Sequence, residues 1–167
     1  MKIFPAVAAL ELLDAGSLGA ASPSVEVAFE RPGRAPYRRR LDWLVRQALT
    51  QSSNLAYDRL VQLVGVDALH AGLLGPERGF GQTAVQLTYS DSVATLLHSP
   101  AIEAGGVRRA AHESEGVSRC ALAENCTSVA ALAEVMRRIM LHEALPELSG
   151  CGCGRPPWPC CATRWAL

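Results

Sequence analysis

Residues 41–65 read LDWLVRQALTQSSNLAYDRLVQLVG, and this stretch decides the fold. Apolar side chains recur there at helical spacing in two groups: Leu41, Leu44, Val45, Ala48 and Leu49, then Leu55, Leu60, Leu63 and Val64. This period predicts two helices that each bury one face. A polar Ser-x-Asn at Ser52–Asn54 separates them, and Gly65 is a typical helix stop. We therefore expect helix, tight polar turn, helix.

The chain before this stretch predicts one more helix and little else. Residues 2–15 are apolar nearly all round, which is typical of a buried central helix. Residues 17–36 are rich in Gly, Ser, Pro and Ala and are predicted as a loop. One short strand is expected in that loop, because Val25, Val27 and Phe29 alternate with polar residues. The arginine run at 38–40 is interpreted as a solvated edge before the next helix and not as a phosphate site.

After Gly65 the pattern becomes weaker. Asp67 is expected to cap a short helix that ends at Gly75-Pro76 and carries His70 on its surface. A strand is predicted near 85–89 and a short helix near 92–97. A last helix opens at Thr127 or Ser128, and its apolar face is Leu132, Val135, Met136, Ile139 and Met140. The fold class predicted is mainly α.

Composition limits the possible functions. The chain has 167 residues, enough for one domain with a core, and 49% of them are apolar. Its net charge is zero, so the charge balance predicts neither nucleic acid nor an anionic membrane as a partner. No segment reaches the ~18 apolar residues that a membrane span requires. There is one lysine, Lys2.

The chain divides at residue 147. Residues 148–167 have no hydrophobic period and hold four of the six cysteines. Three readings stay open for this tail: out-of-frame translation, a disordered native tail, or a metal site built from Cys-x-Cys and Cys-Cys. The last fits the usual zinc spacing poorly. Cys120 and Cys126 could pair or could both be buried, and the four histidines form no helical metal pair, so no cofactor is predicted.

Lys2 and the Ser52–Asn54 turn together resemble a known pair of motifs. Lys2 enters a buried helix about 50 residues before Ser-x-Asn, and a Thr-capped helix at 125–145 follows later. This order resembles the class A-like serine β-lactamases and D-Ala-D-Ala peptidases, over roughly residues 1–147. Met1-Lys2 looks like the end of their Ser-x-x-Lys motif, with the serine two residues before Met1. The resemblance implies the helical portion of an α+β fold, truncated at both ends and lacking most of its antiparallel sheet.

The same resemblance implies a chemistry. Lys2 corresponds to the lysine that deprotonates the nucleophilic serine, Ser52 to the serine that bridges it to the leaving nitrogen, and Asn54 to the asparagine that binds the substrate amide. Lys2 and Ser52 are thus the expected catalytic residues and Asn54 the substrate-binding one. The expected substrate is a β-lactam or a peptidoglycan-like amide. The expected location is extracytoplasmic, in the periplasm or secreted, although no signal peptide is visible.

Several departures predict an inactive chain. The nucleophilic serine and the Lys-Thr-Gly motif are absent, and Ser53 replaces the usual Asp. No Glu-x-x-Leu-Asn occurs, and the acids available instead are Glu103, Glu113 and Glu115. The alternative function is a non-catalytic helical binding module. Ser52 and Asn54 could then be helix caps and Lys2 a surface residue. We also expect the missing sheet to expose the helix at 2–15, which would favour self-association.

Overall fold

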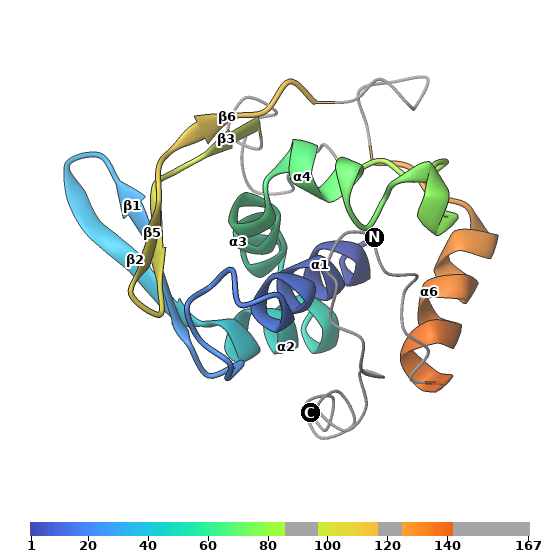
Figure 1. The fold of residues 1–167 in the computed structure, drawn as a ribbon, viewed down its shortest axis with the longest axis horizontal. Coiled ribbons are helices and arrows are strands. Elements are labelled where there is room, and N and C mark those ends of the chain that lie inside the picture. The colour runs from blue at the N-terminus through green and yellow to red at the C-terminus, as the bar shows by residue number, and fades with distance from the viewer. Residues whose placement is uncertain (86–96, 117–124, 142–167) are drawn as a thin grey trace.

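The computed structural model describes residues 1–85, 97–116 and 125–141 (Figure 1). Over these ranges the fold is α+β, with helices predominant. The α-helices are α1 (Ile3–Asp14), α2 (Leu41–Thr50), α3 (Asn54–Val64), α4 (Val66–Ala71) and α6 (Val129–Leu141). The strands are β1 (Glu26–Arg31), β2 (Arg34–Arg40), β3 (His98–Ser99), β4 (Ile102–Ala104), β5 (Val107–Arg109) and β6 (His112–Glu113). None of the described helices is long and apolar enough to cross a membrane.

Helix α1 lies at the centre, against α2 and α3 (Figure 1). Its prediction as a buried helix is confirmed, since Phe4 and Ala9 have no exposed surface. The expectation that this helix would be left exposed is wrong. Helices α2 and α3 pack along it, and Phe80 meets Phe4 edge to face at 5.7 Å between ring centroids. The apolar surface that does remain exposed lies mainly on α6.

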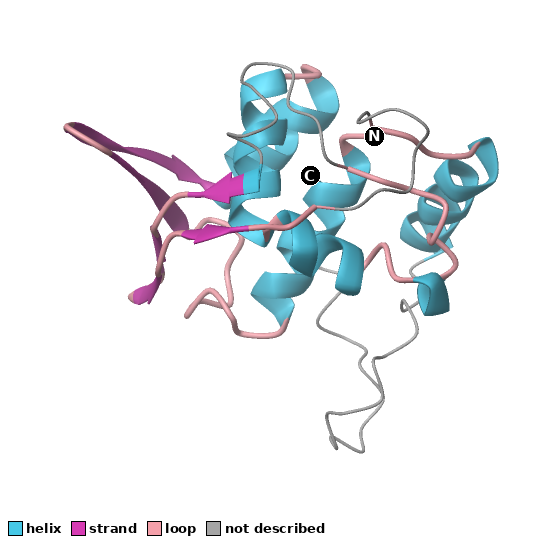
Figure 2. Cartoon of the chain, turned by 90° about the horizontal axis from the view of Figure 1, so that it is seen from above, coloured by secondary structure: helices cyan, strands magenta, loops and turns pink. Residues whose placement is uncertain are grey.

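The sheet is larger than the sequence predicted. Strand β1 lies where one short strand was expected, but β2 pairs with it over the arginine run and gives a four-stranded antiparallel sheet in the order β2-β1-β4-β5. The register places Phe29 opposite Tyr37. Residues 38–40 are exposed and directly precede α2, as expected of a solvated edge before a helix, and they also form the end of the outer strand of this sheet. Figure 2 shows the strands gathered at one end of the helical body.

Arginine side chains stack on aromatic rings at this edge. The Arg59 guanidinium lies 5.7 Å from the Phe29 ring centroid and 5.3 Å from that of Tyr37. The Arg39 guanidinium lies 5.0 Å from Tyr37 and 5.2 Å from Trp43. Such contacts contribute about 0.5–1 kcal/mol each at exposed sites. These contacts help to hold β2 against α2 and α3, although the surface of this strand is almost wholly exposed.

The other predicted helices and strands lie partly inside and partly outside the described residues. Ser128 caps α6, because its hydroxyl accepts a hydrogen bond from the Ala131 N–H at 3.0 Å. The expectation that Asp67 caps the next helix is wrong: α4 begins after Gly65, and the Asp67 carboxylate accepts from the Glu115 and Gly116 N–H groups instead. Helix α4 ends at Ala71, earlier than predicted. Most of the strand predicted at 85–89, nearly all of the helix predicted at 92–97, and the whole tail at 148–167 lie outside the described residues.

Candidate functional site

The turn between α2 and α3 is built by three consecutive polar residues. Helix α2 ends at Thr50, and Ser53 caps α3 by accepting a hydrogen bond from the Ala56 N–H at 3.3 Å. Ser52 has φ 51° and is the one non-glycine residue with positive φ in the described ranges. Side chains rarely adopt this left-handed conformation, because Cβ crowds the following carbonyl. The cap of α3 is thus Ser53, which leaves the side chain of Ser52 for another role.

Lys2 reaches this turn from the start of α1. Its Nζ donates to the backbone oxygen of Ser52, to Ser52 Oγ at 3.2 Å and to Asn54 Oδ1 at 2.7 Å. An ammonium has three N–H donors, and these three oxygens match them in number. The structure therefore brings together all three site residues that the sequence singled out, although 50 positions separate Lys2 from Ser52. Lys2 is not a lysine that extends freely into solvent.

The protein surroundings of Lys2 favour the neutral form of its amine more than bulk water would. Burial lowers the pKa of the Lys2 ammonium below its ordinary value, and the negative charge of Asp58 partly opposes this. Asp58 is 1% exposed and lies one helical turn after Asn54. The sequence analysis missed this residue, although the spacing of four on one helix was a signal that could have found it.

The hydrogen bonds also orient the two polar side chains. Ser52 Oγ accepts from Lys2, so its own O–H proton remains to be donated elsewhere. Asn54 Oδ1 accepts from Lys2, so the two N–H donors of its amide point away from that bond. The turn thus presents a hydroxyl donor and amide donors next to an amine of lowered pKa. This set of groups is suited to proton transfer beside a bound carbonyl.

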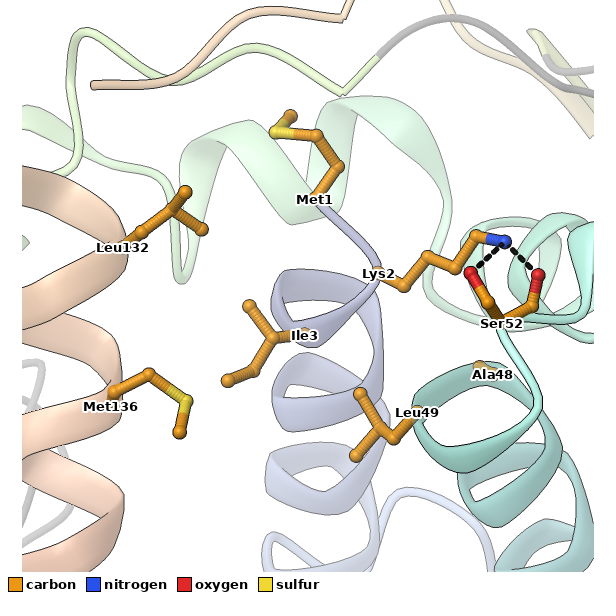
Figure 3. A pocket seen from close by; sticks show the side chains of 8 residues that line it. All are labelled: Met1, Lys2, Ile3, Ala48, Leu49, Ser52, Leu132 and Met136. Carbon is orange, nitrogen blue, oxygen red and sulfur yellow. Dashed lines mark hydrogen bonds between the residues drawn. The ribbon is translucent and has the colours of Figure 1, made fainter. Parts of the chain in front are cut away.

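A hollow of about 390 Å³ opens beside Lys2 and Ser52 (Figure 3). Side chains from three parts of the fold line it: Met1, Lys2 and Ile3 at the start of α1, Ala48, Leu49 and Ser52 at the end of α2, and Leu132 and Met136 on α6. Apart from Lys2 and Ser52, these side chains are apolar. The site therefore combines one polar corner with apolar walls.

The acids proposed as alternatives lie elsewhere. Glu103 belongs to β4, and Glu113 belongs to β6, where it pairs with His98 at 2.5 Å. The backbone N–H of Glu115 is held by Asp67 at 3.0 Å. None of the three lines the hollow beside Lys2.

His70 is a correction. It is 3% exposed instead of lying on the surface, and its Nε2 accepts a hydrogen bond from the Val85 N–H at 3.1 Å. Its Nδ1 lies 2.7 Å from the Val66 carbonyl. With Nε2 as acceptor, Nδ1 carries the proton of a neutral ring and donates it to that carbonyl. His70 therefore joins α4 to the backbone at Val85.

Metal-binding chemistry has little support in the described ranges. No cluster of three or more His, Cys, Asp or Glu side chains that could hold an ion occurs there. Cys126 is in a disulfide bond, which is one of the two alternatives left open for it, and Cys120 lies outside the described residues. The four tail cysteines lie outside them too.

The chain matches no protein-family model, no curated protein and no solved structure in the comparisons.

Proposed function

We propose that the chain carries the lysine, serine and asparagine of a serine acyl-transfer site like that of β-lactamases and D-Ala-D-Ala peptidases, on the helical portion of that fold. One observation supports this most: Lys2 Nζ donates to both Ser52 Oγ and Asn54 Oδ1, at 3.2 and 2.7 Å. An accidental surface contact would not select the two residues that the motif names. The substrate would be a β-lactam or a related peptidoglycan-like amide, met outside the cytoplasmic membrane.

The chemistry follows from the positions of these groups. A serine three residues before Lys2 would lie on the same helix face as the amine. Neutral Lys2 takes the proton of that serine while its oxygen attacks the substrate carbonyl. The proton then passes through Ser52 to the leaving nitrogen as the C–N bond breaks. The amide N–H groups of Asn54 hold the substrate, and an ester between the serine and the acyl group remains.

A polypeptide that starts at Met1 does not contain a serine three residues before Lys2, so we expect this polypeptide to form no acyl-enzyme. The test compares it with a version in which Ser-Ala precedes Met1, which places a serine three residues before Lys2. Both are incubated with a fluorescent penicillin, and covalent labelling is followed by intact mass. We expect label on the extended chain alone, and slow release, because none of the described residues that line the hollow is an acid.

Variants of the extended chain test the roles. Lys2→Ala and Ser52→Ala are each expected to slow acylation by about 100-fold or more, as loss of a proton-transfer group does. Ser53→Ala is the matched control: it removes a helix cap from the neighbouring position and should keep the labelling rate. A folded extended chain that stays unlabelled, or that labels equally without Lys2, would contradict the proposal.

A second candidate is a non-catalytic binding module, and the apolar hollow is the observation that favours it. The same experiment separates the two. Penicillin that binds reversibly to both versions, without covalent label on the extended one, would favour the binding module.

A further inference from the structure

We propose that the hollow beside Lys2 and Ser52 is a pocket for an apolar acyl group, and that the preferred ligand is an amide whose acyl part is aliphatic or aromatic. This inference rests on the proposed function, since it names the substrate class of the same site. It concerns binding alone and involves no covalent step.

The walls determine the apolar part of the ligand. The six apolar side chains are Met1, Ile3, Ala48, Leu49, Leu132 and Met136. Two of them are large and still half open to solvent, Leu49 at 40% and Met136 at 48% exposure. A bound apolar group would remove this surface from water, and each buried methylene favours binding. Figure 3 shows Leu132 and Met136 on α6 facing Ile3 and Leu49 across the opening.

The polar corner determines the head of the ligand. Among the described residues that line the hollow, Lys2 has the one charged side chain and none is an acid that could receive a cationic ligand. The N–H donors of Lys2 hold the oxygens of Ser52 and Asn54 in place. The Ser52 hydroxyl proton requires an acceptor, and an amide carbonyl is a neutral one. An amide group therefore fits this corner of the pocket better than an amine.

The size favours a small molecule over a protein segment. A volume of about 390 Å³ lies at the low end of the range of small-ligand pockets. A partner helix would need a longer groove than one bounded by a single turn of each element. The pocket ends where the Ser52–Asn54 turn begins, so an acyl group inside it places the amide beside the proposed catalytic residues.

The chain provides its own probes. It has three methionines: Met1 and Met136 line the hollow, while Met140 lies one turn further along α6 and is 71% exposed. The full chain, labelled with ¹³C at the methionine methyl groups, is titrated by NMR with N-hexanoylglycinamide and with N-acetylglycinamide. We expect the hexanoyl compound to shift the Met1 and Met136 signals saturably, to leave Met140 in place, and to bind at least tenfold more tightly than the acetyl compound.

Two variants on one helix sharpen the test. Met136→Gln keeps the length of the side chain and adds polarity to the wall, so it should weaken hexanoyl binding about tenfold, read from the Met1 signal. Met140→Gln makes the same change outside the pocket and should leave the affinity unchanged. Equal affinity for the two compounds, equal shifts at all three methionines, or no effect of Met136→Gln would overturn the inference.

Failure here is distinguishable from failure of the proposed function. An extended chain that is acylated by penicillin through Lys2 but shows no preference for the hexanoyl compound keeps the function and rejects the acyl pocket. A chain that prefers the hexanoyl compound but never acylates keeps the pocket and rejects the hydrolase.

Discussion

The backbone of Ser52, whose hydroxyl accepts a hydrogen bond from Lys2, is strained. Its φ of 51° lies in the left-handed region, where a side chain costs roughly 1–2 kcal/mol relative to glycine. Strain of this kind is often found at functional sites, because the surrounding structure holds the residue for a purpose other than stability. The helix-cap alternative gives no reason for Ser52 to adopt this conformation, since Ser53 is the cap of α3.

Replacing Ser52 should separate stability from function. We expect Ser52→Gly to be about 1 kcal/mol more stable than Ser52→Ala, because glycine adopts positive φ without the Cβ penalty. Both variants lose the hydroxyl and should lose acylation equally in the extended chain. Urea unfolding followed by circular dichroism measures the difference. Equal stability of the two variants would show that Ser52 is not held in the left-handed region.

At this scale the sequence predicted Lys2, Ser52 and Asn54, because a motif names residue types at fixed spacing. It did not find Asp58, whose effect depends on burial beneath the turn. The prediction that His70 lies on the surface was wrong. Its sequence context does not show whether a histidine on a short helix is exposed or bonded to a distant backbone N–H.

Among the elements, the helices were predicted well and the sheet poorly. Helices α2, α3 and α6 have apolar side chains at helical spacing, and α1 is apolar nearly all round. Strand β2 has no such period, since only Tyr37 of its seven residues is even half-buried. It pairs through its backbone and through arginine stacking on rings from other elements. Propensity and alternation cannot reveal a strand held in this way.

Gly105 lets the β4–β5 turn pack closely against the loop after α1. A Cβ on Gly105 would lie 2.4 Å from the Leu18 carbonyl oxygen, whereas a Cβ on Gly33 would meet nothing within 4 Å. Both residues have positive φ, 53° and 67°. Gly33→Ala should therefore cost only the conformational penalty, about 1 kcal/mol, and Gly105→Ala roughly 2 kcal/mol more from the backbone clash. Chemical unfolding of both variants measures this, and equal losses would mean that the loop is not packed on the β4–β5 turn.

Within the described residues, α6 has four of the eight large exposed apolar side chains and α1 has none. Val129, Met136 and Met140 follow one another along one face of α6, with exposures of 85%, 48% and 71%. Contiguous apolar surface of this kind favours association. The sequence analysis expected self-association from an uncovered α1, and the structure moves the surface that would cause it to the opposite side of the hollow.

Self-association should therefore respond to α6. We expect sedimentation velocity to show a concentration-dependent oligomer that Met140→Glu weakens at least tenfold, because a carboxylate in an apolar contact loses its hydration. Ala130→Glu makes the same charge change beside the stripe and should have a smaller effect. A monomer at all concentrations, or equal effects of the two variants, would contradict this.

The central claim is that Lys2, Ser52 and Asn54 form one hydrogen-bonded site, and its most direct test is the pKa of Lys2. Because Lys2 is the only lysine, selective ¹³C labelling of lysine Cε gives one side-chain NMR signal to titrate. We predict a pKa below the ordinary value, because burial disfavours the ammonium. Between the folded and unfolded pKa values the unfolded chain binds more protons, so Lys2 opposes folding at lower pH and this cost fades as pH rises through that window.

Substitutions around Lys2 distinguish a hydrogen-bonded amine from a freely solvated one. Asn54→Ala removes an acceptor of the charged amine, and Asp58→Asn removes a negative charge, so each should lower the pKa of Lys2 further. Gln51→Ala, an exposed change at the end of α2, should leave it unchanged. A lowered pKa that falls again in Asn54→Ala would support the site. An ordinary pKa that no variant moves would contradict it.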